Sequence, residues 1–242
     1  MSKPKTEQVT IWTQPVRIPT GEVMLDGELN VPKGARGVVL FAHGSGSSRF
    51  SPRNQYVARV IRDAGIGTLL FDLLTREEEA VDLRTRHLRF DIDLLAERLV
   101  DATRWLEQEA DRITVEASPE HLRPGYFGSS TGGGAALVAA AKLGEAVGAV
   151  VSRGGRPDLA GPALAQVKSP TLLIVGGHDE PVIEMNEAAR AQLRCENELK
   201  IVPGATHLFE EPGTLEEVAR LAAEWFRQHL QATKPATGLK KI

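Results

Sequence analysis

The sequence is poor in cysteine and in long apolar runs, and each scarcity excludes a class of protein. Cys195 is the one cysteine among 242 residues, so an internal disulfide is impossible and a reducing compartment is expected. The sequence contains no apolar run of about 18 residues, so we expect no membrane-spanning helix and no membrane partner. The first eight residues are polar and lack the apolar centre of a secretion signal. These absences together predict a cytoplasmic protein.

A strong charge of one sign is also missing. The 29 Lys and Arg residues are nearly balanced by 32 Asp and Glu residues, which leaves a formal net charge of −3. That charge is too small to indicate a nucleic-acid partner. The histidines are scattered with no zinc-like spacing, and no dinucleotide fingerprint with a downstream acid occurs. We therefore expect neither a metal nor an organic cofactor.

The organisation of the chain favours one domain. No internal repeat or interior low-complexity linker occurs, so we expect a single domain over residues 1–242, with loose tails at about residues 1–7 and 232–242. Two alternating segments, Val9–Ile18 and Glu22–Val31, predict an antiparallel strand pair bounded by Pro19-Thr20-Gly21.

Short apolar runs follow this pair and are typical of strands buried on both faces of a parallel sheet. The runs are Gly37–Ala42, Gly67–Leu73, Pro124–Gly128, Val147–Ser152, Thr171–Val175 and Leu199–Val202. Helical apolar spacing over residues 92–106 and 218–226 alternates with them. Thr214 and Glu217 predict a capping box at the start of the last helix, and Pro181 suits the first turn of another. The pattern predicts an α/β fold with a mostly parallel, doubly wound sheet that binds ligands at its carboxyl edge.

The most informative motif is Gly128-Ser129-Ser130-Thr131-Gly132, which reads G-x-S-x-G between a strand-like and a helix-like segment. A serine hydroxyl is a weak nucleophile, so it needs a base and an exposed presentation. A sharp strand-to-helix turn supplies the presentation. Asp179 follows the predicted strand Thr171–Val175 and His207 follows the last predicted strand, so the chain order is Ser, Asp, His. We expect His207 to take the proton from Ser130 while Asp179 orients the imidazole.

Other residues compete for these roles. Asp158 also follows a predicted strand and is the alternative acid, and Cys195 has no histidine near it in the sequence, so we expect it to be structural. A lone histidine is more often structural than catalytic. The remaining histidines fit the role of base less well: His43 lies in a Gly/Ser-rich loop, His87 lies in a charged segment, His121 lies in a polar loop, His178 precedes Asp179 directly, and His229 lies in the last helix.

A tetrahedral oxyanion needs hydrogen-bond donors. The segment Phe41–Ser48 ends the first central strand with small residues that can turn an N–H toward the serine. We expect the donors to be the backbone N–H groups of Ser45 and Thr131. A simple turn or a phosphate-binding loop is the alternative for this segment, although it lacks the Gly-Lys-Ser ending of nucleotide-binding loops.

These motifs, together with His178-Asp179-Glu180-Pro181 and Gly204-Ala205-Thr206-His207, resemble the α/β-hydrolase superfamily from about residue 8 to 231. The compact size resembles the dienelactone hydrolase-like group. The resemblance implies an α/β-hydrolase fold without an inserted cap domain. Dienelactone hydrolases proper carry a cysteine nucleophile, whereas this chain has Ser130, so the resemblance implies a serine esterase more than lactone hydrolysis.

Two loops are expected to shape the substrate pocket, at residues 75–90 and 152–157. Arg153 and Arg156 are candidates to bind an acidic substrate group, with pairing to nearby acids as the alternative. The segment between Ser152 and Thr171 is too short for a lid, so an open site for small, soluble acyl esters is expected. The leading hypothesis is a carboxylesterase that forms an acyl-enzyme. Acyl transfer or perhydrolysis on the same triad, a non-catalytic binding protein, and a homo-oligomer remain open.

Overall fold

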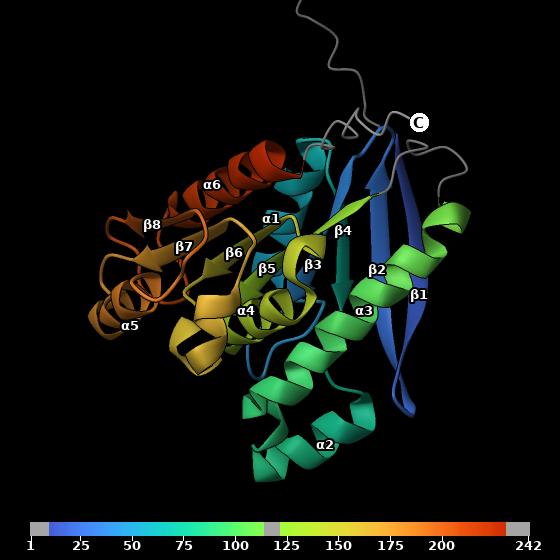
Figure 1. The fold of residues 1–242 in the computed structure, drawn as a ribbon, viewed down its shortest axis with the longest axis horizontal. Helices are drawn as coiled ribbons and strands as arrows, with labels where there is room; N and C mark the ends of the chain where they lie inside the picture. Colours follow the sequence, from blue (N-terminus) through green and yellow to red (C-terminus); the bar gives the residue numbers. More distant parts are fainter. Residues whose placement is uncertain (1–9, 114–121, 231–242) are drawn as a thin grey trace, which may run out of the picture.

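A mixed sheet forms the centre of the molecule (Figure 1). The computed structural model describes residues 10–113 and 122–230. The predicted loose tails and His121 lie outside these described residues. Eight strands stand in the order β1-β2-β4-β3-β5-β6-β7-β8. They are β1 (Ile11–Thr20), β2 (Val23–Pro32), β3 (Gly37–Ala42), β4 (Gly67–Phe71), β5 (Arg123–Ser129), β6 (Ala149–Arg153), β7 (Thr171–Gly176) and β8 (Asn197–Val202).

The antiparallel pair at the start of the chain is confirmed, but its turn is displaced. β1 pairs with β2 along its whole length, from Ile11 opposite Pro32 to Thr20 opposite Val23. The connection therefore lies at residues 21–22, with Gly21 at φ +52°, and not at Pro19-Thr20-Gly21 as predicted. Pro19 lies within β1, where an edge strand tolerates the missing N–H donor. β2 also runs antiparallel to β4, and the remaining strand pairs are parallel.

Helices cover both faces of the sheet, so the doubly wound α/β prediction is confirmed. Two helices, α1 (Pro52–Asp63) and α6 (Thr214–His229), pack on one face, and the buried residues of α3, α4 and α5 belong to the core on the other face (Figure 1). The remaining elements are α2 (Arg76–Thr85), η1 (Leu88–Phe90), α3 (Ile92–Ile113), α4 (Thr131–Leu143), η2 (Gly144–Ala146), η3 (Pro157–Gln166) and α5 (Glu180–Arg190). No cap domain is inserted within the described ranges.

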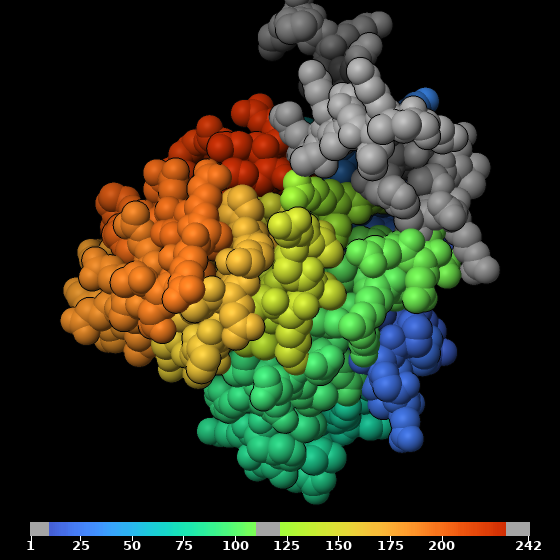
Figure 2. All heavy atoms as spheres, viewed as in Figure 1, coloured from blue at the N-terminus to red at the C-terminus, as the bar shows by residue number. Residues whose placement is uncertain are grey.

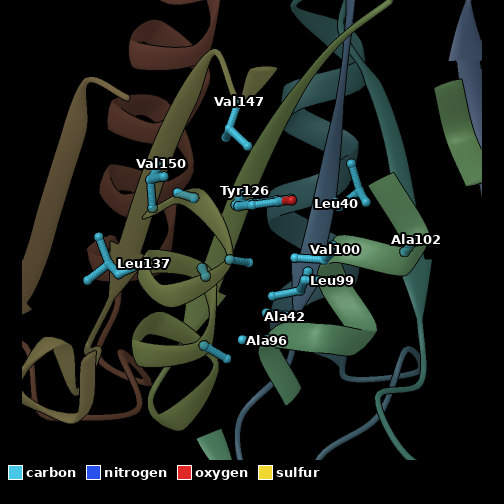
Figure 3. Packing of buried hydrophobic residues seen from close by; sticks show 14 of the residues in the cluster. Leu40, Ala42, Ala96, Leu99, Val100, Ala102, Tyr126, Leu137, Val147 and Val150 are labelled. Carbon is cyan, nitrogen blue, oxygen red and sulfur yellow. The ribbon is translucent and has the colours of Figure 1, made fainter. Parts of the chain in front are cut away.

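The larger core lies between the sheet and α3 and α4. Figure 3 shows Tyr126 of β5 between Val150 on the neighbouring strand and Leu99 on α3. The Tyr126 hydroxyl is fully buried and lies 2.6 Å from Thr103 Oγ1. Burial raises the pKa of this phenol, and the hydrogen bond satisfies its polar atom. The packing fixes β5, which leads directly into the G-x-S-x-G turn.

The predicted capping box at Thr214 is wrong. Helix α6 begins after Gly213, whose φ of +84° places it in the left-handed region. The Thr214 hydroxyl donates backward to Glu211 O at 2.7 Å and caps no N–H of the helix. A glycine at this corner lets the chain turn sharply into the helix, and the Thr214 side chain stabilises the preceding turn instead.

The segment at residues 75–90, expected as a loop, contains the helix α2 followed by η1. Thr75 and Glu78 form the capping box that starts α2, with Glu78 N–H bound to Thr75 Oγ1 at 3.2 Å and Thr75 N–H bound to Glu78 Oε2 at 2.8 Å. Figure 2 shows this segment as part of a lobe at the lower end of the molecule. The Glu77–Glu79 run occupies the first turn of the helix, where negative charge is favourable.

Charged side chains hold α2 in place. The buried Arg98 of α3 donates to Glu78 Oε1 at 2.6 Å. Asp82 is the one fully buried side chain of α2. Its carboxylate pairs with Arg89 and accepts the N–H of Leu88 at 2.8 Å. Because the apolar side chains of this helix remain largely exposed, these polar contacts determine where it lies.

None of the helices within residues 10–113 and 122–230 is both long enough and apolar enough to cross a bilayer.

Candidate active site

Ser130 lies in a sharp turn between β5 and α4, as the motif predicts. Its backbone has φ +51° and ψ −122°, a strained conformation for a residue with a side chain. A Cβ on Gly128 would lie 2.4 Å from Gly132 O, and a Cβ on Gly132 would lie 2.1 Å from Ala42 O. Both positions therefore require glycine. The Ser130 side chain is half-buried, so a substrate can reach it.

The loop after β6 holds the strained serine through main-chain hydrogen bonds. Ser130 N–H donates to Arg153 O at 3.3 Å, and Ser130 O accepts the N–H of Gly133 at 2.9 Å and of Arg156 at 3.0 Å. From the sequence, the side chains of Arg153 and Arg156 were candidates to bind an acidic substrate group. Their backbones support the turn in addition, a role that the sequence pattern did not indicate.

Asp179 and His207 meet at the carboxyl edge of the sheet. His207 Nδ1 lies 2.7 Å from Asp179 Oδ2. Asp179 follows β7 and precedes α5, and Pro181 occupies the first turn of that helix as predicted. Because the carboxylate accepts from Nδ1, it favours the tautomer whose Nε2 is free to take a proton. The His207 side chain is 38% exposed and that of Asp179 is 15% exposed, so solvent can reach the imidazole.

The turn that carries His207 is held by Glu211. Thr206 donates to the Glu211 carboxylate through its N–H at 3.1 Å and its hydroxyl at 2.7 Å. These hydrogen bonds hold the pKa of the Glu211 carboxyl below its usual range. Phe209 follows with φ +55° and is almost fully buried. Glu211 could not be predicted from the sequence, since a Thr and a Glu five residues apart in a loop form no recognisable pattern.

Ser130 and His207 both contact the loop after β6. A Cβ on Gly154 would lie 3.5 Å from His207 Cε1, and the preceding residue, Arg153, accepts the Ser130 N–H. The imidazole and the serine thus border the same loop. No hydrogen bond between Ser130 Oγ and His207 is present in the described part of the chain, and such catalytic bonds commonly tighten only when substrate binds.

The two expected oxyanion donors lie next to each other. Thr131 is the first residue of α4, and the N–H groups of a first helical turn lack intrahelical partners. Ser45 N–H donates to Thr131 Oγ1 at 3.1 Å. An oxyanion that uses the Ser45 donor must therefore share it with the Thr131 hydroxyl or displace that hydroxyl. A Cβ on Gly44 would lie 3.1 Å from Ser130 Cβ, so this loop and the turn are in close contact.

A small pocket opens beside these donors. Ser45 and Thr131 line one side of it, and Leu73 and Leu95 give it an apolar surface. The lobe of α2 and η1 contributes further lining residues at its outer border. The pocket is thus next to the proposed oxyanion donors. It is bounded by the charged segment at residues 75–90, which was expected from the sequence to shape it.

His43 also lines this pocket, but its two ring nitrogens are already engaged. Its Nε2 accepts the N–H of Leu73 at 2.9 Å, and its Nδ1 lies 3.1 Å from Gly44 O, to which it donates. Burial lowers the pKa of His43, so its ring remains neutral. This histidine joins the loops after β3 and β4 and is not available as a base.

The other candidates have structural roles. Arg156 donates to Asp158 through Nε at 2.9 Å and Nη2 at 2.7 Å, so the alternative acid is paired to an arginine and not to His207. Cys195 lies between the end of α5 and β8, is half-buried, and contacts Thr171 Oγ1 at 3.8 Å. Burial raises the pKa of its thiol, which disfavours the reactive thiolate.

Within residues 10–113 and 122–230, no group of three or more His, Cys, Asp or Glu side chains is arranged to hold a metal ion.

The sheet order, the strained serine turn and the missing cap define the α/β-hydrolase fold. Est1E from Butyrivibrio proteoclasticus shares it, with a TM-score of 0.68 at 15% identity over 89% of this chain and 98% of that one. The chain belongs to the dienelactone hydrolase family, whose model matches residues 25–235. The crystal structure of a dienelactone hydrolase from Anabaena variabilis is 62% identical, covers 91% of this chain and 99% of that chain, and has a TM-score of 0.87.

Curated relatives are longer than this chain. Two Mycobacterium tuberculosis proteins, each named a putative phosphoribosyl transferase, are 56% identical over 221 residues. The match covers 91% of this chain and 47% of each relative. The chain therefore spans about half the length of these proteins.

Proposed function

We propose that this hydrolase is a serine carboxylesterase in which Ser130, His207 and Asp179 form a catalytic triad. The hydrogen bond of 2.7 Å between Asp179 Oδ2 and His207 Nδ1, at the edge where the strained Ser130 turn lies, carries the proposal. A strained serine turn and a carboxylate-bound imidazole with a free Nε2 are the two parts that nucleophilic attack on an ester needs.

The proposed reaction has two steps. Ser130 Oγ attacks the ester carbonyl while His207 Nε2 takes the hydroxyl proton and passes it to the leaving alcohol. Water then attacks the acyl-enzyme with His207 as base and releases the acid. The backbone N–H groups of Thr131 and Ser45 are proposed to stabilise the oxyanion in both steps, with loss of one such donor typically costing about 3 kcal/mol of barrier.

An activated serine is the property that separates an enzyme from a non-catalytic binding protein. We expect a fluorophosphonate probe to label the native chain, because Ser130 Oγ has a base available, and we expect Ser130→Ala to abolish labelling. Ser129→Ala is the matched control, since that neighbouring serine is buried and donates to Asn54 Oδ1 at 3.2 Å. The label is detected by intact mass and located by peptide mapping. An unlabelled native chain would reject the proposed mechanism.

The size of the pocket sets the expected acyl group. The pocket beside Ser45 and Thr131 is small and has only a few apolar lining residues, among them Leu73 and Leu95, so it suits a short acyl chain better than the chain of a palmitate ester. We expect kcat/KM for 4-nitrophenyl acetate and butyrate to exceed that for the palmitate by about 100-fold, since a chain that does not fit displaces the ester carbonyl from Ser130, and a displacement of about 1 Å can cost about 100-fold in rate. Rates across the ester series, measured below the micelle concentration, test this. A preference for palmitate would contradict it.

Two other activities share features of this site. Acyl transfer or perhydrolysis uses the same acyl-enzyme, and product ratios with added alcohol or peroxide separate these outcomes from hydrolysis. The name phosphoribosyl transferase belongs to relatives of twice this length, and the paired Asp179 and His207 favour ester hydrolysis for the portion that matches this chain.

A further inference from the structure

The hydroxyl of Thr131 lies between a backbone donor and the small pocket beside the serine turn. Thr131 follows Ser130 directly, begins α4 and is only 3% exposed. Its Oγ1 accepts the N–H of Ser45 at 3.1 Å, and both residues line the pocket. A hydroxyl accepts through its lone pairs and has one proton of its own to donate. Among the described residues no acceptor for this proton is found, so it is available to an oxygen that enters the pocket.

The loop that supplies the Ser45 N–H is held by its own hydrogen bonds. Gly44 O accepts the N–H of Ser47 at 3.1 Å and the Nδ1–H of His43 at 3.1 Å. His43 is also bound through Nε2 to the loop after β4. Because these bonds fix the loop, the Ser45 N–H remains directed at Thr131 Oγ1 and cannot readily turn toward a substrate.

Thr131 has little freedom to leave this hydrogen bond. Its side chain is branched at Cβ, which restricts χ1 in a helix, and it is almost fully buried. The start of α4 is packed closely on the end of β3, since a Cβ on Gly132 would lie 2.1 Å from Ala42 O. We therefore expect an oxyanion to meet the hydroxyl in place and to accept its proton, rather than to displace it from the Ser45 N–H.

A hydroxyl that accepts from an amide and donates to an anion is a stronger donor than an isolated hydroxyl. The Ser45 N–H polarises the O–H bond of Thr131, and hydrogen bonds in such a chain strengthen one another. A hydrogen bond to a charged acceptor also contributes more than one to a neutral acceptor. The Thr131 hydroxyl therefore gains most when negative charge develops on the carbonyl oxygen, which is the condition for lowering the barrier.

We propose that the Thr131 hydroxyl is a side-chain donor to the oxyanion, and that the Ser45 N–H acts largely through it. This inference deepens the esterase function proposed above and rests on it. When Ser130 Oγ bonds to the carbonyl carbon, its proton passes to His207 and the electrons of the C=O double bond move to the oxygen. The N–H and the hydroxyl of Thr131 both donate to that oxygen, and the hydroxyl keeps its proton. Collapse of the intermediate re-forms the C=O bond and expels the alcohol, which takes the proton from His207.

Removal of the hydroxyl at constant side-chain shape tests the proposal. Thr131→Val puts a methyl group in place of the hydroxyl. It should lower kcat and kcat/KM for 4-nitrophenyl butyrate by the same factor of about 10², as expected for a lost oxyanion donor. KM should stay near the native value, because the lost hydrogen bond strengthens only in the transition state. Steady-state rates of the native chain and the variant provide the measurement.

Three further variants separate the hydroxyl from packing. Thr131→Ser retains the hydroxyl and should keep most of the native rate. Thr85→Val is the matched control, because it removes an exposed threonine hydroxyl that donates to Val81 O at 3.2 Å, and it should leave both constants unchanged. Equal losses in Thr131→Ser and Thr131→Val would show a packing role and overturn the proposal. Unchanged or faster turnover in Thr131→Val or Thr131→Ala would also overturn it, since the hydroxyl would then only occupy the Ser45 donor.

A stable adduct tests the same contact in the native chain, and it decides the matter if Thr131→Val does not fold. Trifluorobutanone adds to the nucleophilic serine as a hemiketal, whose charged oxygen stands in for that of the tetrahedral intermediate. In the crystal structure of this adduct we expect Thr131 Oγ1 at about 2.5–3.0 Å from the hemiketal oxygen. A hemiketal oxygen bound directly by the Ser45 N–H, with Thr131 Oγ1 turned away, overturns the proposal and leaves the esterase function intact. A native chain that neither hydrolyses the ester nor forms the adduct overturns both.

Discussion

Ser130→Ala and His207→Ala each lower kcat/KM for 4-nitrophenyl acetate by about 10⁴-fold or more, and the double variant is no slower than the slower single variant. The expected magnitude is that of triads in which the nucleophile and the base act as one unit. The hydroxyl cannot attack without a proton acceptor, and the imidazole has nothing to deprotonate without the hydroxyl. Removing the second partner therefore costs little more.

Steady-state rates of the two single variants and the double variant form the test. His87→Ala is the matched control, because this exposed histidine lies after α2 and hydrogen-bonds Thr85. Its rate should equal that of the native chain. Multiplicative losses in the double variant would show that Ser130 and His207 act independently, which the proposed proton transfer does not allow.

Asp179→Asn lowers kcat/KM by about 10⁴-fold, the loss found for the corresponding change in a serine protease. The side chain keeps its shape, but an amide nitrogen that faces His207 Nδ1 donates a hydrogen bond where the carboxylate accepts one. The imidazole then carries its proton on Nε2 and cannot accept another from Ser130. The loss should appear in kcat more than in KM, since Asp179 is proposed to act through its hydrogen bond to His207.

Asp158→Asn is the control for that change, because it alters an acid of the same type that pairs with Arg156. Its activity should remain within a factor of about two of the native rate, as exposed ion pairs contribute little. Loss of activity in Asp158→Asn with retention in Asp179→Asn would exchange the roles of the two acids.

The sequence predicts the sheet well because its central strands contain little besides apolar side chains. The run Thr171–Val175 corresponds to β7, which extends one residue further. The placement of Asp179 and His207 was also predictable, since each follows a strand whose carboxyl end must reach the same edge. Chain order and strand position carry this information without any knowledge of loop conformation.

The features that could not be predicted from the sequence are those that depend on loop conformation. The capping box was assigned to Thr214, but the same residue pattern forms a real box at Thr75 and Glu78, and sequence alone does not separate the two. The hydrogen bond from Ser45 N–H to Thr131 Oγ1 and the support of the His207 turn by Glu211 depend on how separate loops meet. Long-range contacts between polar groups leave no periodicity in the sequence.

Because charged contacts at two positions hold α2 in place, most of its other positions are free to vary. The helix that borders the pocket is anchored by Glu78 to Arg98 and by Asp82 to Arg89, while its apolar residues remain outside the core. Its other positions can therefore mutate, lengthen or shorten without opening a void in the protein interior. Changes in this segment can therefore alter the border of the pocket while the proposed catalytic residues, which lie on separate loops, stay in place.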